Sequence, residues 1–216
     1  MFSKNLFCIN KESVNPPLKA KGFTLIELLI VIAILAILAT VVLIVINPIQ
    51  MFAQARDSQR IYDMNTLNGA VALYLTTVAS PSLQGGGGYG TCAANCWGSL
   101  AGITCNFVGG QTLSGSASFT RAVDGSGWLP VVLSDISGGS PLSALPKDPT
   151  NTTTYFYSYA CDNTSKWFEF HSKMESCRYS HANSGCGGAG ADDVEGADGG
   201  SSLTLYEVGN KPGLNL

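Results

Sequence analysis

Hydrophobic residues concentrate in one run near the start of the chain. Between Phe23 and Ile46, 21 of 24 residues are apolar, and only Thr24, Glu27 and Thr40 interrupt the run. A helix of 24 residues is about 36 Å long, whereas the hydrocarbon core of a bilayer is about 30 Å thick. The pattern therefore predicts a helix over 23–46 that can span a membrane.

The residues before this run predict its orientation. The first 22 residues carry four lysines, at positions 4, 11, 19 and 21, against Glu12. Because positive charge favours the cytoplasmic side, we expect the remainder of the chain to lie outside the cytoplasm. A cleavable secretory signal is disfavoured, since the apolar run is too long for one and no A-x-A-like site follows Ile46.

A second, amphipathic helix is predicted after Pro48. Proline lacks an N–H and should kink or open the helix at that point, and Pro81 should end the helix near 78–80. The apolar stripe of this helix recurs every three or four residues, at Met64, Leu67, Val71, Leu75 and Val78.

The polar side of the same helix carries charges three residues apart. Asp57 and Asp63 each stand three positions from Arg60. Such pairs contribute a few tenths of a kcal/mol, about 0.2–0.5 kcal/mol each, when they are exposed. We expect them to be solvated surface charges.

Beyond residue 81 the pattern favours short strands. Candidate strands are 128–133, 154–160, 167–174 and 203–208, with a turn at 162–165, whereas 91–127 is rich in Gly, Ser and Thr and is expected to be irregular. A helix covering a small antiparallel sheet is an α+β arrangement.

The four glycines at 85–88 lack the Lys-Ser/Thr of a phosphate loop, so nucleotide binding is not expected.

Composition narrows the class of protein further. Charged residues make up 12% of the 216 residues and the net charge is −3, so direct nucleic-acid binding is not inferred. We expect the two histidines, His171 and His181, to be ordinary surface residues. The sequence contains no Ser-His-Asp or Cys-His arrangement with ordered support, which argues against an enzyme.

The start of the apolar run resembles the prepilin signal of type IV pilins and type II secretion pseudopilins. The resemblance lies in the segment Gly22-Phe23-Thr24-Leu25-Ile26-Glu27-Leu28-Leu29 and in the apolar residues that continue to Leu38. The resemblance implies a pilin-like fold, cleavage after Gly22 by a prepilin peptidase, an N-methylated Phe23, and a role for Glu27 in subunit assembly. No Lys or Arg lies between Phe23 and Ala55, so we expect the partner of Glu27 to be the new α-amine of a neighbouring chain.

The predicted organisation follows from these patterns and this resemblance. It consists of a leader (1–22), a transmembrane and assembly helix (23–46), its amphipathic continuation (47–80) and a Gly-rich extracytoplasmic domain with antiparallel strands (81–216). The turn Leu145-Pro146-Lys147-Asp148-Pro149, followed by an aromatic strand, is similar to the C-terminal half of major pseudopilins.

Six cysteines follow the apolar run, and Cys8 lies in the leader. An even number of cysteines outside the cytoplasm favours disulfides, and six allow 15 pairings. The spacing of the first two also fits a zinc site, although no second close pair completes it. The disulfide candidates are Cys92, Cys96, Cys105, Cys161, Cys177 and Cys186.

An acidic, Gly-rich segment spans 185–200. Its carboxylates, at Asp192, Asp193, Glu195 and Asp198, could supply oxygen ligands to calcium. Major pseudopilins have a calcium site in their C-terminal loop, but these residues do not align with it one by one, and a solvated loop is the alternative. No other cofactor is expected.

Three functions remain open from the sequence. The first is a structural subunit of a type IV pilus-like filament, whose partners would be like or related subunits, the prepilin peptidase and an inner-membrane assembly platform. The second is a pseudopilin of a type II secretion system. The third is an enzyme or receptor that is merely anchored by the helix, which no set of residues supports. The expected location is the inner membrane, and then a surface or periplasmic filament.

Overall fold

The computed structural model describes residues 22–85, 91–92, 96–100, 120–181, 185–211, 213–214 and 216, with the side chains of 44 and 45 excepted. The chain divides into two compact units, Met1–Ile46 and Asn47–Leu216.

The first unit contains helix α1, Leu25–Ile46. Within the described residues, one helix is long and apolar enough to cross a membrane, and it is this one: Leu25–Leu43 has a mean hydropathy of 3.1, and none of this stretch is buried. Nineteen residues make a helix of about 28 Å, close to the thickness of the hydrocarbon core.

Helix α2, Pro48–Thr77, begins the second unit with its own N-cap. Asn47 adopts a left-handed backbone conformation with φ of 43°, and its side-chain oxygen accepts from the Gln50 N–H at 3.5 Å. Pro48 occupies the first helical position, where its missing N–H costs nothing. The predicted break at Pro48 is therefore present as a non-helical residue between two helices.

The second unit contains a four-stranded sheet. Strands β1 (Trp97–Gly98), β2 (Ser158–Asp162), β3 (Trp167–Ser172) and β4 (Tyr206–Gly209) pair in that order, each antiparallel to its neighbour. The β2–β3 turn is the one predicted, and the Asp162 carboxylate accepts from the Thr164 N–H at 2.8 Å within it.

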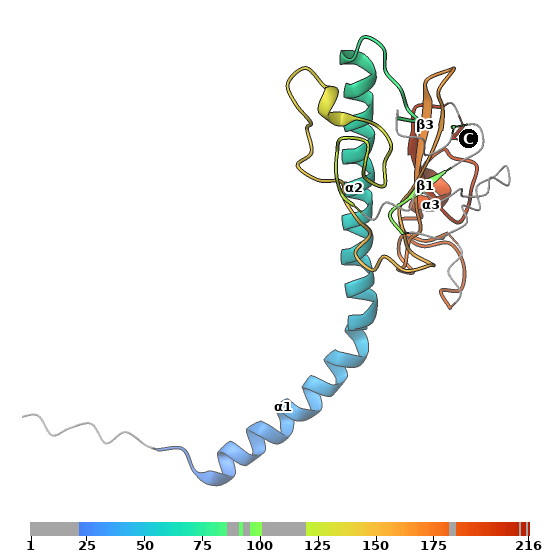
Figure 1. Ribbon diagram of the computed structural model, residues 1–216. Helices are drawn as coiled ribbons and strands as arrows, with labels where there is room; N and C mark the ends of the chain where they lie inside the picture. The colour runs from blue at the N-terminus through green and yellow to red at the C-terminus, as the bar shows by residue number, and fades with distance from the viewer. Residues whose placement is uncertain are drawn as a thin grey trace, which may run out of the picture. The chain divides into compact units, whose positions relative to one another are not determined.

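The main core lies between α2 and one face of this sheet (Figure 1). Met64, Leu67 and Val71 of the predicted apolar stripe are fully buried there, against Phe168 and Phe170 of β3. Aromatic contacts continue across the sheet, with the rings of Tyr159 and Phe170 5.0 Å apart. This arrangement confirms the predicted α+β, pilin-like fold.

Several element boundaries differ from those predicted. Residues 128–133 do not form a strand: Val132 makes an isolated bridge with Asp124, and Leu133–Asp135 is a 3-10 helix, η1. Pro130 lacks the N–H that a paired strand requires. The two-residue β1 lies in the segment predicted to be irregular, and a four-residue helix, α3 (Val194–Ala197), lies in the acidic segment.

Candidate functional site

The segment that precedes α1 is open to other molecules. Phe23 is 89% exposed, and a Cβ added to Gly22 would meet nothing within 4 Å. Packing among the described residues therefore does not require glycine at position 22. A peptidase that binds this segment is one source of such a requirement.

Thr24 and Glu27 form a capping box at the start of α1. The Glu27 carboxylate accepts from the Thr24 N–H at 2.7 Å and from the Thr24 hydroxyl at 2.8 Å, and the Glu27 N–H donates to the Thr24 hydroxyl oxygen at 3.3 Å. These bonds satisfy N–H groups that have no partner within the helix. Both bonds to the carboxylate end on Oε2, so Oε1 takes part in neither.

This capping box was missed by reasoning about charge alone. The sequence between Phe23 and Ala55 contains no lysine or arginine, yet Thr24 stands three residues before Glu27 and supplies two donors. The capping box could have been predicted from the sequence, because Ser or Thr followed three residues later by Glu before an apolar run is typical of a helix start.

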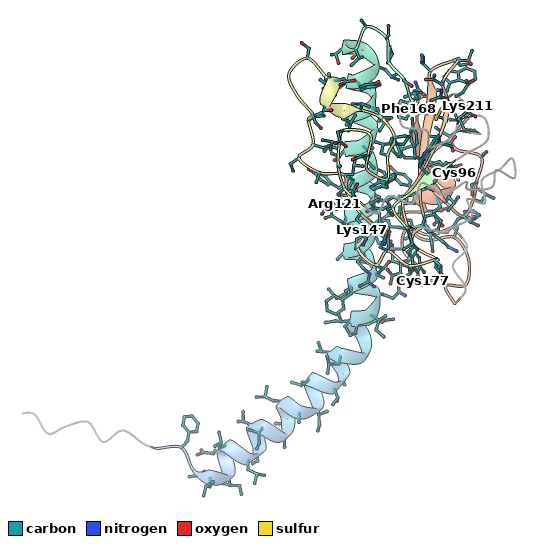
Figure 2. All side chains as sticks on the ribbon, viewed as in Figure 1. Cys96, Arg121, Lys147, Phe168, Cys177 and Lys211 are labelled. Carbon is teal, nitrogen blue, oxygen red and sulfur yellow. A yellow bond between two sulfur atoms is a disulfide. The ribbon has the colours of Figure 1, made fainter. Side chains whose placement is uncertain are left out.

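The side chains of α1 project outward on all sides of the helix (Figure 2). Every large apolar side chain described between Leu25 and Leu43 is about half exposed or more. The mid-helix hydroxyl of Thr40 donates to the Ile37 carbonyl oxygen at 2.8 Å, so it needs no partner outside the helix. Such a surface requires an apolar environment supplied by lipid or by other protein chains.

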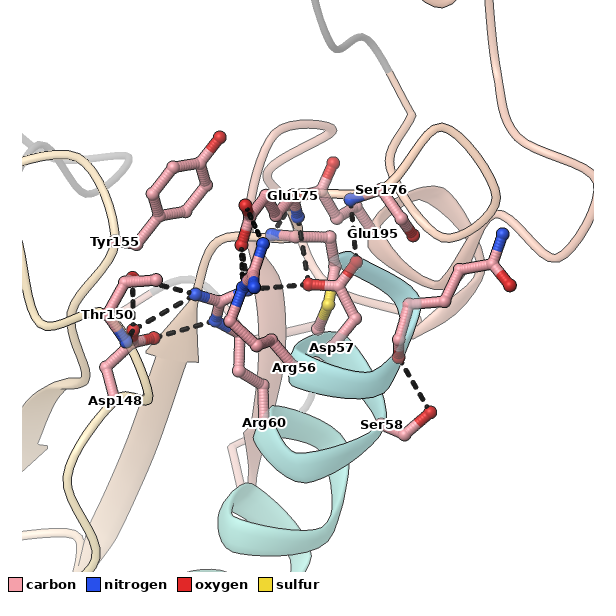
Figure 3. Close-up of polar contacts among 12 residues, drawn as sticks. Arg56, Asp57, Ser58, Arg60, Asp148, Thr150, Tyr155, Glu175, Ser176 and Glu195 are labelled. Carbon is pink, nitrogen blue, oxygen red and sulfur yellow. Dashed lines mark hydrogen bonds and ion pairs between the residues drawn. The ribbon is translucent and has the colours of Figure 1, made fainter. Parts of the chain in front are cut away.

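In the second unit, a buried guanidinium joins α2 to two distant segments (Figure 3). Arg60 donates to Asp148 through Nε at 2.7 Å and Nη2 at 3.0 Å, and to Asp57 through Nη1 at 2.7 Å. Nη1 also lies 3.4 Å from the Glu175 carboxylate, and the Tyr155 ring lies 5.0 Å from the guanidinium carbon.

Burial and ion pairing act in opposite directions on this group. Burial alone would lower the pKa of Arg60, but the bonds and charges of Asp148 and Asp57 outweigh it and raise that pKa. Burial alone would raise the pKa of Asp148. The hydrogen bonds and charge of the Arg60 guanidinium outweigh this effect and hold the pKa of Asp148 below its usual range. Both groups are therefore charged in the folded chain.

The expectation of solvated charges on this face is wrong. Asp57 and Arg60 are fully buried and Asp63 is nearly so, where it accepts from the Tyr157 hydroxyl at 2.7 Å. The three-residue spacing of these charges in the sequence indicates only that they lie near one another on one helix. It did not show that Asp148, 88 residues away in the Leu145–Pro149 turn, completes a buried network.

The cysteine candidates give two disulfides among the described residues. Cys92 is bonded to Cys161 of β2, and Cys177 to Cys186. Cys96 is disulfide-bonded as well, and Cys105 lies outside the described residues. With Cys92 bonded to Cys161, the Cys92 and Cys96 thiolates do not form the pair that a zinc site would need.

The four acidic candidates for calcium each have a separate partner within the chain. Asp192 pairs with Arg178, Asp193 caps α3 and contacts His181 Nδ1 at 2.6 Å, and Glu195 accepts from the Met174 N–H at 2.7 Å. Asp198 accepts from the Gly200 N–H at 2.8 Å. Calcium binding by this segment stays a prediction.

The expectation that His171 lies at the surface is wrong. It is 1% exposed and packs with Glu169 of the same strand and Glu207 of β4. Burial raises the pKa of Glu207 to about 8. For Glu169, burial acts in the same direction, but the hydrogen bond with His171 outweighs it and lowers the pKa. Strand alternation predicts that Glu169 and His171 share a face, but it does not show that this face is covered.

Comparison with known protein families gives one match. Residues 18–43 match the prokaryotic N-terminal methylation motif. No curated protein and no solved structure matches the chain. The motif includes Gly22, Phe23 and Glu27 and most of α1, and an N-terminal methylation motif on an apolar helix fits the type IV pilin and pseudopilin family. It points to a structural subunit rather than an enzyme.

Proposed function

We propose that this chain is a structural subunit of a type IV pilus-like filament, processed by a prepilin peptidase and assembled through α1. The observation that carries the proposal is a methylation motif placed on a helix whose apolar surface is exposed on every side. An ordinary anchor needs the apolar helix but not the motif.

Processing would cut between Gly22 and Phe23. The open space around Gly22 and the exposure of Phe23 support access by a peptidase. The cut would leave the apolar helix on the mature chain and place a new α-amine at Phe23. This amine is the positive charge that the described part of α1 otherwise lacks.

Assembly would transfer α1 from lipid to a bundle of like helices. Both environments are apolar, so the transfer has little hydrophobic cost, and specific contacts decide the packing. Glu27 would accept the Phe23 amine of a neighbouring subunit. Because the capping box uses Oε2, the Oε1 atom can receive that amine while the cap stays intact.

The partners would be the prepilin peptidase, related subunits and an inner-membrane assembly platform. The lysines before the apolar run favour a cytoplasmic N-terminus, with the second unit outside the cytoplasm. The two disulfides of that unit support an oxidising compartment.

The second candidate function is a pseudopilin of a type II secretion system. One observation favours it: Asp148, from the turn that is similar to major pseudopilins, is held by the buried Arg60 of α2. The assembly chemistry of α1 would be the same. Loss of surface filaments in a deletion strain would favour the pilus, whereas loss of secreted hydrolases with no filament defect would favour the pseudopilus.

Two variants of Glu27 test the assembly step. Glu27→Ala removes the carboxylate and its two bonds to Thr24, whereas Glu27→Gln keeps an acceptor for these bonds and removes only the charge. If the charge pairs with a neighbour's amine, both variants stay in the inner membrane and few subunits appear in sheared filaments. Filament yield at the wild-type level from Glu27→Gln would contradict the charge pairing.

Mass spectrometry of the mature chain tests processing. We expect Phe23 at the N-terminus with an added methyl group, and we expect a bulky residue at Gly22 to prevent cleavage. The unprocessed variant should still insert in the membrane, because its apolar helix is unchanged. A mature wild-type chain that begins at Met1 would contradict the proposal.

A further inference from the structure

A histidine and two glutamates meet on the sheet face that is turned away from α2. Glu169 and His171 are two residues apart on β3, so they point to the same side, opposite to Phe168 and Phe170. His171 pairs in register with Glu207 of β4. All three side chains are at most 3% exposed.

The inward-facing atoms of these residues converge. His171 Nε2 lies 2.6 Å from Glu169 Oε1 and 3.7 Å from Glu207 Oε1. One ligand atom from each residue lies within 4.8 Å of the other two. Ligands placed about 2.1 Å from a tetrahedral metal ion are about 3.4 Å apart. Movements of less than 1 Å would bring both contacts to that separation.

Backbone donors hold the outer oxygen of each carboxylate. Glu169 Oε2 accepts from the Leu216 N–H at 3.0 Å, and Glu207 Oε2 accepts from the Ser202 N–H at 2.7 Å. Outer contacts of this kind orient metal ligands and are a regular part of metal sites. They leave the two Oε1 atoms directed at the imidazole.

A third carboxylate borders the cluster. Among the described residues, Asp198 also approaches it, since its carboxylate accepts from the Glu207 backbone N–H at 2.6 Å. The basic group within the cluster is His171, which contacts the carboxylates of Glu169 and Glu207.

A cavity of about 230 Å³ adjoins the cluster. Glu207 and Asp198 form part of its lining, together with Asn65 of α2. Glu207 is thus both a member of the cluster and part of the lining of this cavity.

We propose that Glu169, His171 and Glu207 form a binding site for a divalent transition metal of the zinc type. One imidazole nitrogen and two carboxylate oxygens suit zinc, whereas calcium takes oxygen ligands only. The three ligands are not among the acidic candidates for calcium, although one of these, Asp198, bonds to the Glu207 backbone. The site does not depend on the proposed function. Bound metal would join β3 to β4 and hold the segments that contain Ser202 and Leu216.

Zinc binding by the full chain in detergent tests this site. After chelator treatment, the chain is titrated with ZnCl2 and its metal content is measured. We expect one zinc ion per chain and a higher midpoint of thermal unfolding. Glu207→Gln keeps the size of the side chain and should weaken zinc binding about tenfold or more. His181→Gln, the matched control at the other histidine, should bind as the wild type does.

Two further measurements keep the proposal testable if Glu207→Gln does not fold. X-ray absorption of the zinc-loaded wild type should show one imidazole in a mixed nitrogen and oxygen shell, and a hundredfold excess of Ca²⁺ should not displace the zinc. The proposal is overturned by a wild-type chain that binds no zinc, by a folded Glu207→Gln that binds normally, by a shell without imidazole, or by displacement with calcium.

Discussion

Replacing Arg60 with alanine should strongly destabilise the second unit. The guanidinium is fully buried and bonds to Asp148 and Asp57, and Glu175 lies within ion-pair distance. The variant leaves these carboxylates without their cation, and removing one partner of a buried ion pair costs about 3–5 kcal/mol. For a unit of this size, each kcal/mol corresponds to about 2–4 °C, so the midpoint should fall by about 6–20 °C.

Arg56→Ala is the matched control. Arg56 lies one turn earlier on α2 and also pairs with Glu175, but its side chain is 32% exposed. Exposed pairs contribute about 0–1 kcal/mol, so this variant should change the midpoint by a few degrees at most. Arg60→Lys should fall between the two, because lysine keeps the charge but cannot form the two-pronged contact with Asp148.

Tryptophan fluorescence during heating is a suitable assay. Trp97 and Trp128 are buried in the core of the second unit, and α1 contains no tryptophan, so the signal reports this unit even when α1 is in detergent. The full chain should be used with its disulfides intact. An Arg60→Ala midpoint no lower than that of Arg56→Ala would refute the reasoning, since it would mean that the buried network contributes no more than a surface pair.

Four other predictions concern separate parts of the chain. Thr24→Ala should cost about 1 kcal/mol at the α1 cap, and faster amide exchange at Glu27 would show it; unchanged exchange would argue against the cap. Alkylation without reductant should leave Cys92, Cys161, Cys177 and Cys186 unlabelled, and labelling of all four would contradict their bonds. Asp148 has a lowered pKa in the folded chain, so its contribution to stability is present above its unfolded pKa of about 3.8 and is lost as pH falls through the folded value. Asp148→Asn should therefore weaken the loss of stability at low pH. If the stability of this variant falls with pH as that of the wild type does, the result would count against the Arg60–Asp148 pair. Calorimetry of the full chain with Ca²⁺ tests the acidic segment: heat that is reduced in Asp192→Asn would support a site there, and no heat would indicate a solvated loop.

The sequence predicts those features of the fold that depend on neighbours along the chain. The apolar run, the break at Pro48 and the stripe of Met64, Leu67 and Val71 arise from local spacing, and the structure has all of them. The β2–β3 turn also follows from a local pattern. These are cases in which hydrophobic periodicity and the backbone limits of proline act within a few residues.

Features that depend on distant residues were not predictable in this way. Arg60 meets Asp148 across 88 residues, and His171 meets Glu207 only because β4 pairs with β3. A charged residue at a helix or strand position is exposed by default, and only the folded chain shows which ones are covered. The same applies to the strand predicted at 128–133, where Pro130 and tertiary packing favoured a 3-10 turn over a ladder.

The Asn47 cap has a consequence for how unwinding would spread along the chain. Helix formation is cooperative because each new residue extends an existing ladder of hydrogen bonds, and a new ladder has to be nucleated separately. Asn47 supplies the first acceptors of α2, through its side chain to the Gln50 N–H and its carbonyl to the Met51 N–H. The ladder of α2 therefore starts afresh at this residue. Fraying or melting of α1 would end at Asn47, and α2 would keep its first turn.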